Sequence, residues 1–141
     1  DFDLISRLEP VYKLPTMEVI LEISELEALH DVENHIEVAK KWRRKGYRYA
    51  IDDFGAGFIS LPFVASLVPE YIKVDRSTML NAVSSEKFRE FLKPLLESLR
   101  TYATEGIIAE GVETEKELKV VKEMGINFVQ GFLFGKPKEL N

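Results

Sequence analysis

Cysteine is absent from the 141-residue chain, and histidine occurs only twice, as His30 and His35. Without cysteine there is no disulfide framework, no thiolate nucleophile and no cysteine-ligated zinc site. The two histidines fall near the start of an expected helix, where a solvated helix face is the simpler interpretation, so zinc is disfavoured. The lack of cysteine fits a reducing compartment. We therefore expect this segment to be cytoplasmic. This expectation is compatible with a membrane anchor elsewhere in a longer parent protein.

Long apolar runs and a positive net charge are lacking too. No apolar run approaches the roughly 18–20 residues that span a bilayer, so we expect no membrane contact by this segment. The formal charge of −5 argues against a general nucleic-acid surface. The largest basic cluster, KKWRRK at 40–45, ends an expected helix, where cations complement the helix dipole. A phosphate-binding patch is the alternative interpretation of that cluster.

What the chain does contain is an alternation of strand-like and helix-like segments. The expected strands are MEVILEI (17–23), YRYAIDD (47–53), YIKVD (71–75), IIAEG (107–111) and INFVQG (126–131), with FLFGK (132–136) as a candidate sixth. The expected helices cover residues 31–46, 60–67, 84–106 and 114–125. Asp31 is a candidate N-cap for the first helix, and Thr114 with Glu117 forms a capping box for the last. This alternation is typical of a parallel sheet covered by helices.

Polar side chains stand at the carboxyl ends of all five expected strands. They are Glu22 and Glu25, Asp52 and Asp53, Lys73 and Asp75, Glu110 and Glu113, and Gln130. In parallel α/β folds this edge is where sites are built. The aspartate pair alone is equally well explained as a turn or a cap, but five successive strand ends favour a shared site. Because a complete barrel needs about 250 residues, we expect an α/β fold that is either an open sheet or an incomplete TIM-barrel-like (βα) fold. It would have five to six mostly parallel strands with flanking helices.

So many carboxylates share a small volume only when cations neutralise them. Ligand sets made of oxygen suit Mg²⁺, Mn²⁺ or Ca²⁺. A pair of such ions activates a water and stabilises an in-line displacement at phosphorus. Adjacent aspartates suit two ions if the strand bends at its end, and Lys73 is a candidate to neutralise charge or orient the water. Gly55 and Gly57 permit a tight, mobile loop just beyond them.

Five segments of the chain resemble, in order, the signatures of the EAL-domain cyclic di-GMP phosphodiesterases. The segments are LEISE (21–25), IDDFGAGFISL (51–61), YIKVDRS (71–77), IIAEGVET (107–114) and VQGFLFGKP (129–137). The resemblance implies a TIM-barrel-like fold and hydrolysis of cyclic di-GMP to linear di-GMP. It also implies dependence on Mg²⁺ or Mn²⁺, with two ions in the complete domain.

The resemblance assigns two groups of site residues. The first group would bind metal or act on the catalytic water: Glu22, Asp52, Asp53, Lys73 and Glu110. The second group would support the substrate region or the loop after Asp53: Glu25, Asp75, Glu113, Gln130, Gly55 and Gly57. The family also uses that loop near its dimer interface.

The family's naming motif, on the first barrel strand, and a metal-binding asparagine on the second strand have no counterpart in this sequence. A Glu27-Ala28-Leu29 tripeptide follows LEISE, in the wrong place, and is a chance match. We therefore expect residues 1–141 to form a partial EAL domain with little activity alone. It would belong to a longer protein or complete its barrel by association, as in a homodimer. A non-catalytic cyclic di-GMP receptor and a ligand-free structural fragment are the alternatives, and the retained acidic set favours the enzyme.

Overall fold

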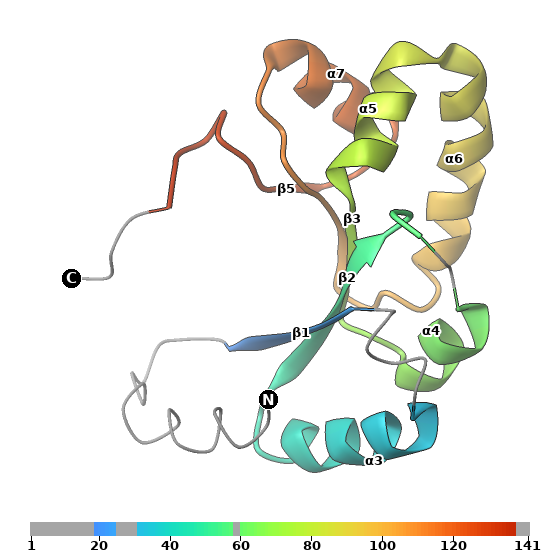
Figure 1. The fold of residues 1–141 in the computed structure, drawn as a ribbon, viewed down its shortest axis with the longest axis vertical. Coiled ribbons are helices and arrows are strands. Elements are labelled where there is room, and N and C mark those ends of the chain that lie inside the picture. Colours follow the sequence, from blue (N-terminus) through green and yellow to red (C-terminus); the bar gives the residue numbers. More distant parts are fainter. Residues whose placement is uncertain (1–18, 25–30, 58–59, 138–141) are drawn as a thin grey trace.

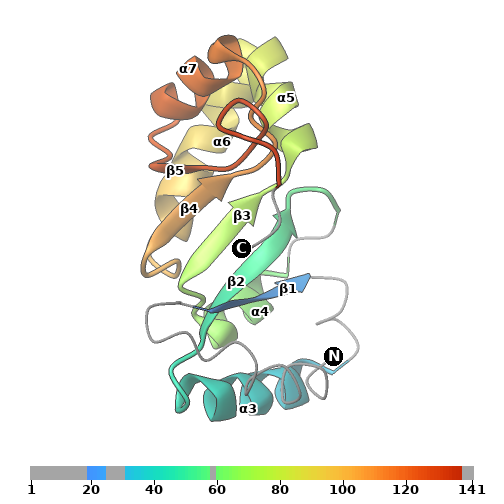
Figure 2. The ribbon, with the colours of Figure 1, turned by 90° about the vertical axis from the view of Figure 1, so that its left-hand side faces the viewer.

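The computed structural model describes residues 19–24, 31–57 and 60–137. One parallel sheet has the order β1-β2-β3-β4-β5. Its strands are β1 Ile20–Ser24, β2 Arg48–Phe54, β3 Tyr71–Val74, β4 Gly106–Ala109 and β5 Phe128–Val129. The helices are α3 Val32–Arg43, α4 Leu61–Leu67, α5 Arg76–Ser84, α6 Glu86–Leu99 and α7 Glu115–Glu123. The helices gather on one face of the sheet (Figure 1), and Figure 2 looks onto the other face, with the strands side by side in chain order.

The hydrophobic core lies between the sheet and the helices. Alternate side chains of a strand point to opposite faces, and in β1 Leu21 and Ile23 are buried while Glu22 between them is exposed. The largest side chains with almost no exposed surface are Tyr49, Ile51, Phe54, Phe63, Leu67, Ile72 and Leu96. Burial of these apolar groups is the main stabilising contribution to the fold. The other face carries Glu22 and Lys73 together with apolar side chains, among them Tyr71 and Phe128, whose rings are in edge-to-face contact.

Local capping explains where the helices begin. The carboxylate of Asp31 accepts a hydrogen bond from the Asn34 N–H at 3.2 Å, which confirms Asp31 as the N-cap of α3. The expected capping box of α7 is also present, with Thr114 and Glu117 each accepting from the other's backbone N–H. These side chains satisfy N–H groups that have no partner within the helix.

The helix expected over 84–106 was wrong in its limits. The chain forms α5 over 76–84 and α6 over 86–99, with Ser85 between them as the N-cap of α6. Helix α5 was missed because only one of its three buried residues, Met79, is strongly apolar. Thr78 and Ala82 are small or polar, so the segment gives little apolar periodicity. The candidate sixth strand was also wrong, because residues 131–134 form a bend and turn in which the Phe134 N–H donates to the Gly131 carbonyl.

At least one member of the basic cluster at 40–45, Arg43, has a structural role. The Arg43 guanidinium donates to the carbonyls of Leu67 and Val68, both at 2.8 Å, and pairs with Glu70 at 3.1 Å. Arg43 thus caps the carboxyl end of α4, where Val68 has a φ of +46°. This observation supports the structural interpretation of the cluster. Within the described ranges, no helix is both long and apolar enough to cross a membrane.

Candidate metal centre

One buried ammonium group is the centre of the acidic strand ends. The Lys73 Nζ on β3 lies 2.7 Å from Glu110 Oε1, 2.8 Å from Glu22 Oε1 and 3.2 Å from Asp52 Oδ1. Glu110 directly follows β4, and Glu22 and Asp52 lie on β1 and β2, so one side chain on β3 pairs with carboxylates from the other three strands or their ends. The Lys73 side chain is only 6% exposed. The parallel sheet therefore brings together residues that are far apart in sequence.

The two adjacent aspartates share the site because β2 is irregular there. The pairing of β2 with β3 shifts in register between Ile51 and Phe54, the mark of a bulge. Asp53 has a φ of +56°, and its N–H donates to Asp52 Oδ1 at 3.0 Å. A regular strand would send consecutive side chains to opposite faces. Here each of Asp52, Asp53 and Glu110 offers a carboxylate oxygen within 4.8 Å of the others.

The carboxylates of this cluster lie close together, and the pKa values of two of them are raised. Burial raises the pKa of Glu110, although its hydrogen bond to Lys73 opposes the change. Partial burial, together with the charges of Asp52 and Asp75, raises the pKa of Asp53. Burial by itself would lower the pKa of Lys73, but hydrogen bonds to Glu110 and Glu22 outweigh it and raise that pKa well above its ordinary value. The site therefore carries more negative charge than its one ammonium offsets.

The donor set fits hard divalent cations. Every candidate ligand in the cluster is a carboxylate oxygen, and the surplus negative charge favours a cation with more than one positive charge. Within the described part of the chain the acidic group capable of holding an ion consists of Asp52, Asp53 and Glu110. Glu22 pairs with the same ammonium group at 2.8 Å but is not part of this group of three.

The structure does not bring all the expected residues into this cluster. Glu113 pairs instead with Arg76, its Oε2 3.0 Å from Nη2. Asp75 accepts a hydrogen bond from the Ser77 N–H and is the N-cap of α5. Gln130 has an exposed side chain, and its backbone joins the ends of β4 and β5. Glu25 lies outside the described residues.

The two loop glycines, Gly55 and Gly57, differ in whether their surroundings would admit a side chain. Gly55 has a φ of +94°, and a Cβ there would collide with Thr78 Oγ1. A side chain at Gly57 would meet nothing within 4 Å. Gly55 is therefore required by local geometry, whereas a role for Gly57 in loop motion stays a prediction.

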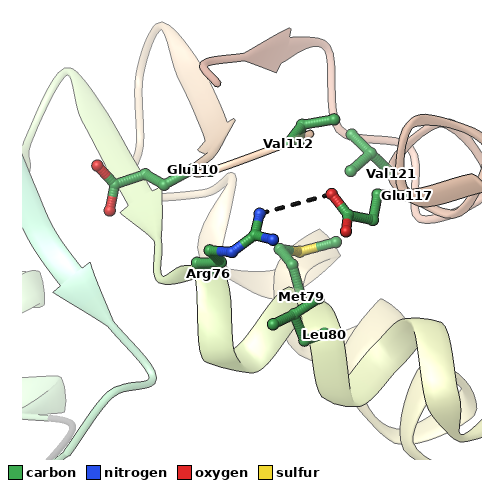
Figure 3. A pocket seen from close by; sticks show the side chains of 8 residues that line it. Arg76, Met79, Leu80, Glu110, Val112, Glu117 and Val121 are labelled. Atoms are coloured by element: carbon green, nitrogen blue, oxygen red, sulfur yellow. Dashed lines mark ion pairs between the residues drawn. The ribbon is translucent and has the colours of Figure 1, made fainter. Parts of the chain in front are cut away.

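Sequence reasoning missed Arg76, which lies between the metal cluster and α7. The available signal was a cation directly after Asp75, three residues beyond Lys73. Its guanidinium contacts Glu113 and Glu117. Figure 3 shows Arg76 beside Glu117 in a recess whose other walls include Met79, Leu80, Val112 and Val121.

The parallel sheet covered by helices, with an acidic cluster at its strand ends, defines an α/β domain of TIM-barrel-like type. Comparison with known proteins identifies the family of this domain. The sequence matches the EAL domain family over residues 3–137, and the chain belongs to this family. Similar proteins include the probable cyclic di-GMP phosphodiesterase PdeD of Escherichia coli, 34% identical over 126 residues. The cyclic di-GMP phosphodiesterase PdeB of Shewanella oneidensis is 28% identical over 138 residues. These matches cover 89% and 98% of this chain but only 23% and 16% of those proteins.

Solved structures of the family share this architecture. The PaMucR phosphodiesterase in its c-di-GMP complex matches with a TM-score of 0.81 and 28% identity, over 96% of this chain and 55% of that one. Klebsiella pneumoniae BlrP1 in a manganese/cy-diGMP complex matches with a TM-score of 0.81 and 29% identity, over 96% of this chain and 35% of that one. These similarities confirm the expected α/β, TIM-barrel-like fold.

Proposed function

We propose that this chain carries part of the metal site of an EAL domain that hydrolyses cyclic di-GMP to linear di-GMP with Mg²⁺ or Mn²⁺. The observation that carries the proposal is the convergence of Glu22, Asp52 and Glu110 on Lys73, with Asp53 beside them. Relatives named as cyclic di-GMP phosphodiesterases, and related structures in complex with that dinucleotide, support the choice of substrate. A cytoplasmic location is part of the same proposal.

The residues of the cluster would divide the chemistry between them. Glu22, Asp52, Asp53 and Glu110 would hold the ions, with Asp53 serving the second. Bound divalent ions would supply an activated water and offset negative charge at the phosphodiester. Lys73 stays protonated because its pKa is raised, so it would orient the water or a phosphate oxygen as a donor and would not act as a base.

We also propose that this chain alone is a poor catalyst. The described sheet has five strands, with β1 and β5 at its edges, whereas a closed barrel has eight. One of the carboxylates that pair with Lys73, that of Glu22, lies on the edge strand β1, so the site borders an open edge of the sheet. Strands from a longer chain, or from a second copy of this one, would complete the opposite wall of the site. We expect turnover by this chain to stay below about 1 s⁻¹, the low end for enzymes.

Titration of cyclic di-GMP with and without Mn²⁺, followed by product analysis, tests the proposal on this chain and on a version extended upstream. We expect metal-dependent linear product mainly from the extended chain, and none from its Asp52→Asn variant. Binding without cleavage by both chains would favour the non-catalytic receptor. Cleavage by the short chain at an ordinary enzymatic rate would contradict the need for completion.

The affinity for Mn²⁺ should fall on mild acidification. Because the pKa values of Asp53 and Glu110 are raised, protons compete with the metal at a pH above the ordinary carboxyl value of about 4. Isothermal titration calorimetry in steps from pH 7 down to pH 4 measures the effect. The affinity should begin to decline at a higher pH than it would for carboxylates with ordinary pKa values. A decline that begins only near the ordinary carboxyl pKa would contradict the assignment of these two ligands.

A further inference from the structure

Arg76 joins two turns at the edge of the metal cluster. It is the first residue of α5 and follows β3, the strand that carries Lys73. Its Nη2 lies 3.0 Å from Glu113 Oε2, and its Nη1 lies 3.5 Å from Glu117 Oε2 (Figure 3). The guanidinium therefore connects the β3–α5 junction to the turn between β4 and α7, which begins at Glu110.

The stem of Arg76 also packs on the backbone of this turn. Gly111, directly after Glu110, has a φ of +66°, and a Cβ there would lie 2.7 Å from Arg76 Cδ and 2.9 Å from Cγ. Only glycine allows the arginine stem to lie this close to the chain. One residue earlier, the Glu110 N–H donates to the Val74 carbonyl of β3 at 3.0 Å. Two independent contacts thus hold the start of the turn against β3.

The far end of the turn is held by Glu117. Its Oε2 accepts from the N–H groups of Glu113 at 2.7 Å and Thr114 at 3.3 Å, and the same atom faces Arg76. The Glu117 side chain is 12% exposed. Apolar side chains line this recess: Met79, Leu80, Val112 and Val121. Such walls limit screening by water and so strengthen the attraction between Arg76 and Glu117.

We propose that Arg76 is a positioning residue for the metal centre. Through Gly111, Glu113 and Glu117 it holds the turn that follows β4, and so keeps the Glu110 carboxylate within reach of Lys73 and of a bound divalent ion. The inference rests on the proposed function, because it concerns that function's metal site. Without the guanidinium, Glu113 loses its partner, Glu117 loses its balancing charge, and the turn is free to move away from β3.

Calorimetric titration of Mn²⁺ into the full chain tests this role, with thermal unfolding recorded in parallel. Arg76→Met should weaken Mn²⁺ binding about tenfold, as the loss of groups that orient metal ligands commonly does. Arg76→Lys keeps the charge and most of the stem and should recover part of the affinity. The matched control is Arg89→Met. In the unaltered protein the Arg89 guanidinium on α6 donates a hydrogen bond to the Ala82 carbonyl of α5 at 2.7 Å, and this variant removes that bond. It should lower the melting temperature and leave Mn²⁺ affinity unchanged.

Each outcome distinguishes the inference from the proposed function. Unchanged affinity in Arg76→Met, or an equal loss in Arg89→Met, would overturn the positioning role and leave the metal site standing. Absence of Mn²⁺ binding by the unaltered chain would instead count against the proposed metal-dependent function, and the role of Arg76 would fall with it. Should Arg76→Met not fold, Glu113→Gln breaks the same ion pair from the other side. It should weaken Mn²⁺ binding in the same direction, and full affinity in that variant would overturn the inference.

Discussion

Replacing Lys73 with methionine should lower the free energy of unfolding of the metal-free protein by about 2–4 kcal/mol. Loss of one partner from a buried ion pair typically costs about 3–5 kcal/mol, and we expect less here because Glu22, on the other side of the pair, is half exposed. Methionine fills the volume of the lysine stem but leaves three carboxylates facing one another without a cation. Urea denaturation at pH 7 measures the change. Lys93→Met, at an exposed position on α6, is the control and should change stability by less than about 0.5 kcal/mol.

The pH dependence of the Lys73→Met effect identifies its cause. Without the ammonium, the pKa of Glu110 should rise further above its ordinary 4.5. A carboxyl group with a raised folded-state pKa stabilises the fold while protonated, and that contribution is lost as the pH rises through the raised value. The stability gap to the unaltered protein should therefore be widest near pH 7 and narrow toward pH 4.5. Added Mn²⁺ should stabilise the variant, because the ion replaces the missing positive charge. A gap independent of pH would point to packing and not to charge.

Substituting alanine for Gly131 should destabilise the protein by about 3 kcal/mol or more, at the upper end of what overpacking costs. A Cβ at this position would overlap the backbone carbonyl oxygen and nitrogen of Val112. Backbone atoms cannot rotate away as a side chain does. Relief would break the hydrogen bonds from the Val112 N–H to the Gln130 carbonyl and from the Leu133 N–H to the Val112 carbonyl.

Gly57 provides the matched control for Gly131. A Cβ there meets nothing within 4 Å, so Gly57→Ala should be neutral or stabilise by about 0.4–1 kcal/mol through the unfolded state. Denaturant midpoints of the two variants test the contrast directly. Similar losses at both positions would contradict the steric explanation for Gly131.

The strand order and most of the core follow from sequence patterns, and one helix does not. Mainly apolar runs such as YAI and YIKV predict buried strands, and the caps at Asp31 and Thr114 are local signals of helix starts. Helix α5 depends on tertiary contacts instead, because Thr78 and Ala82 become buried only when neighbouring elements pack on them. Its position could not be inferred from periodicity.

The candidate site shows the same division. That Glu22, Asp52 and Glu110 would meet Lys73 was predictable, since parallel strands present their carboxyl ends at one edge. The placement of Glu113 was not, because it depends on the direction of the Arg76 side chain. An arginine after a strand end is also common as a solvated surface residue, so sequence alone gives it no preference.

The backbone of Asp53 has a consequence for engineering this domain. A φ of +56° is unfavourable for most residues with a side chain, and asparagine and glycine tolerate it better. Asparagine would also remove the negative charge of the Asp53 carboxyl group, which burial and the neighbouring carboxylates disfavour, as its raised pKa shows. A library of variants selected only for heat resistance should therefore accumulate asparagine or glycine at position 53. Such a selection would remove a proposed metal ligand while raising the thermal stability of the protein.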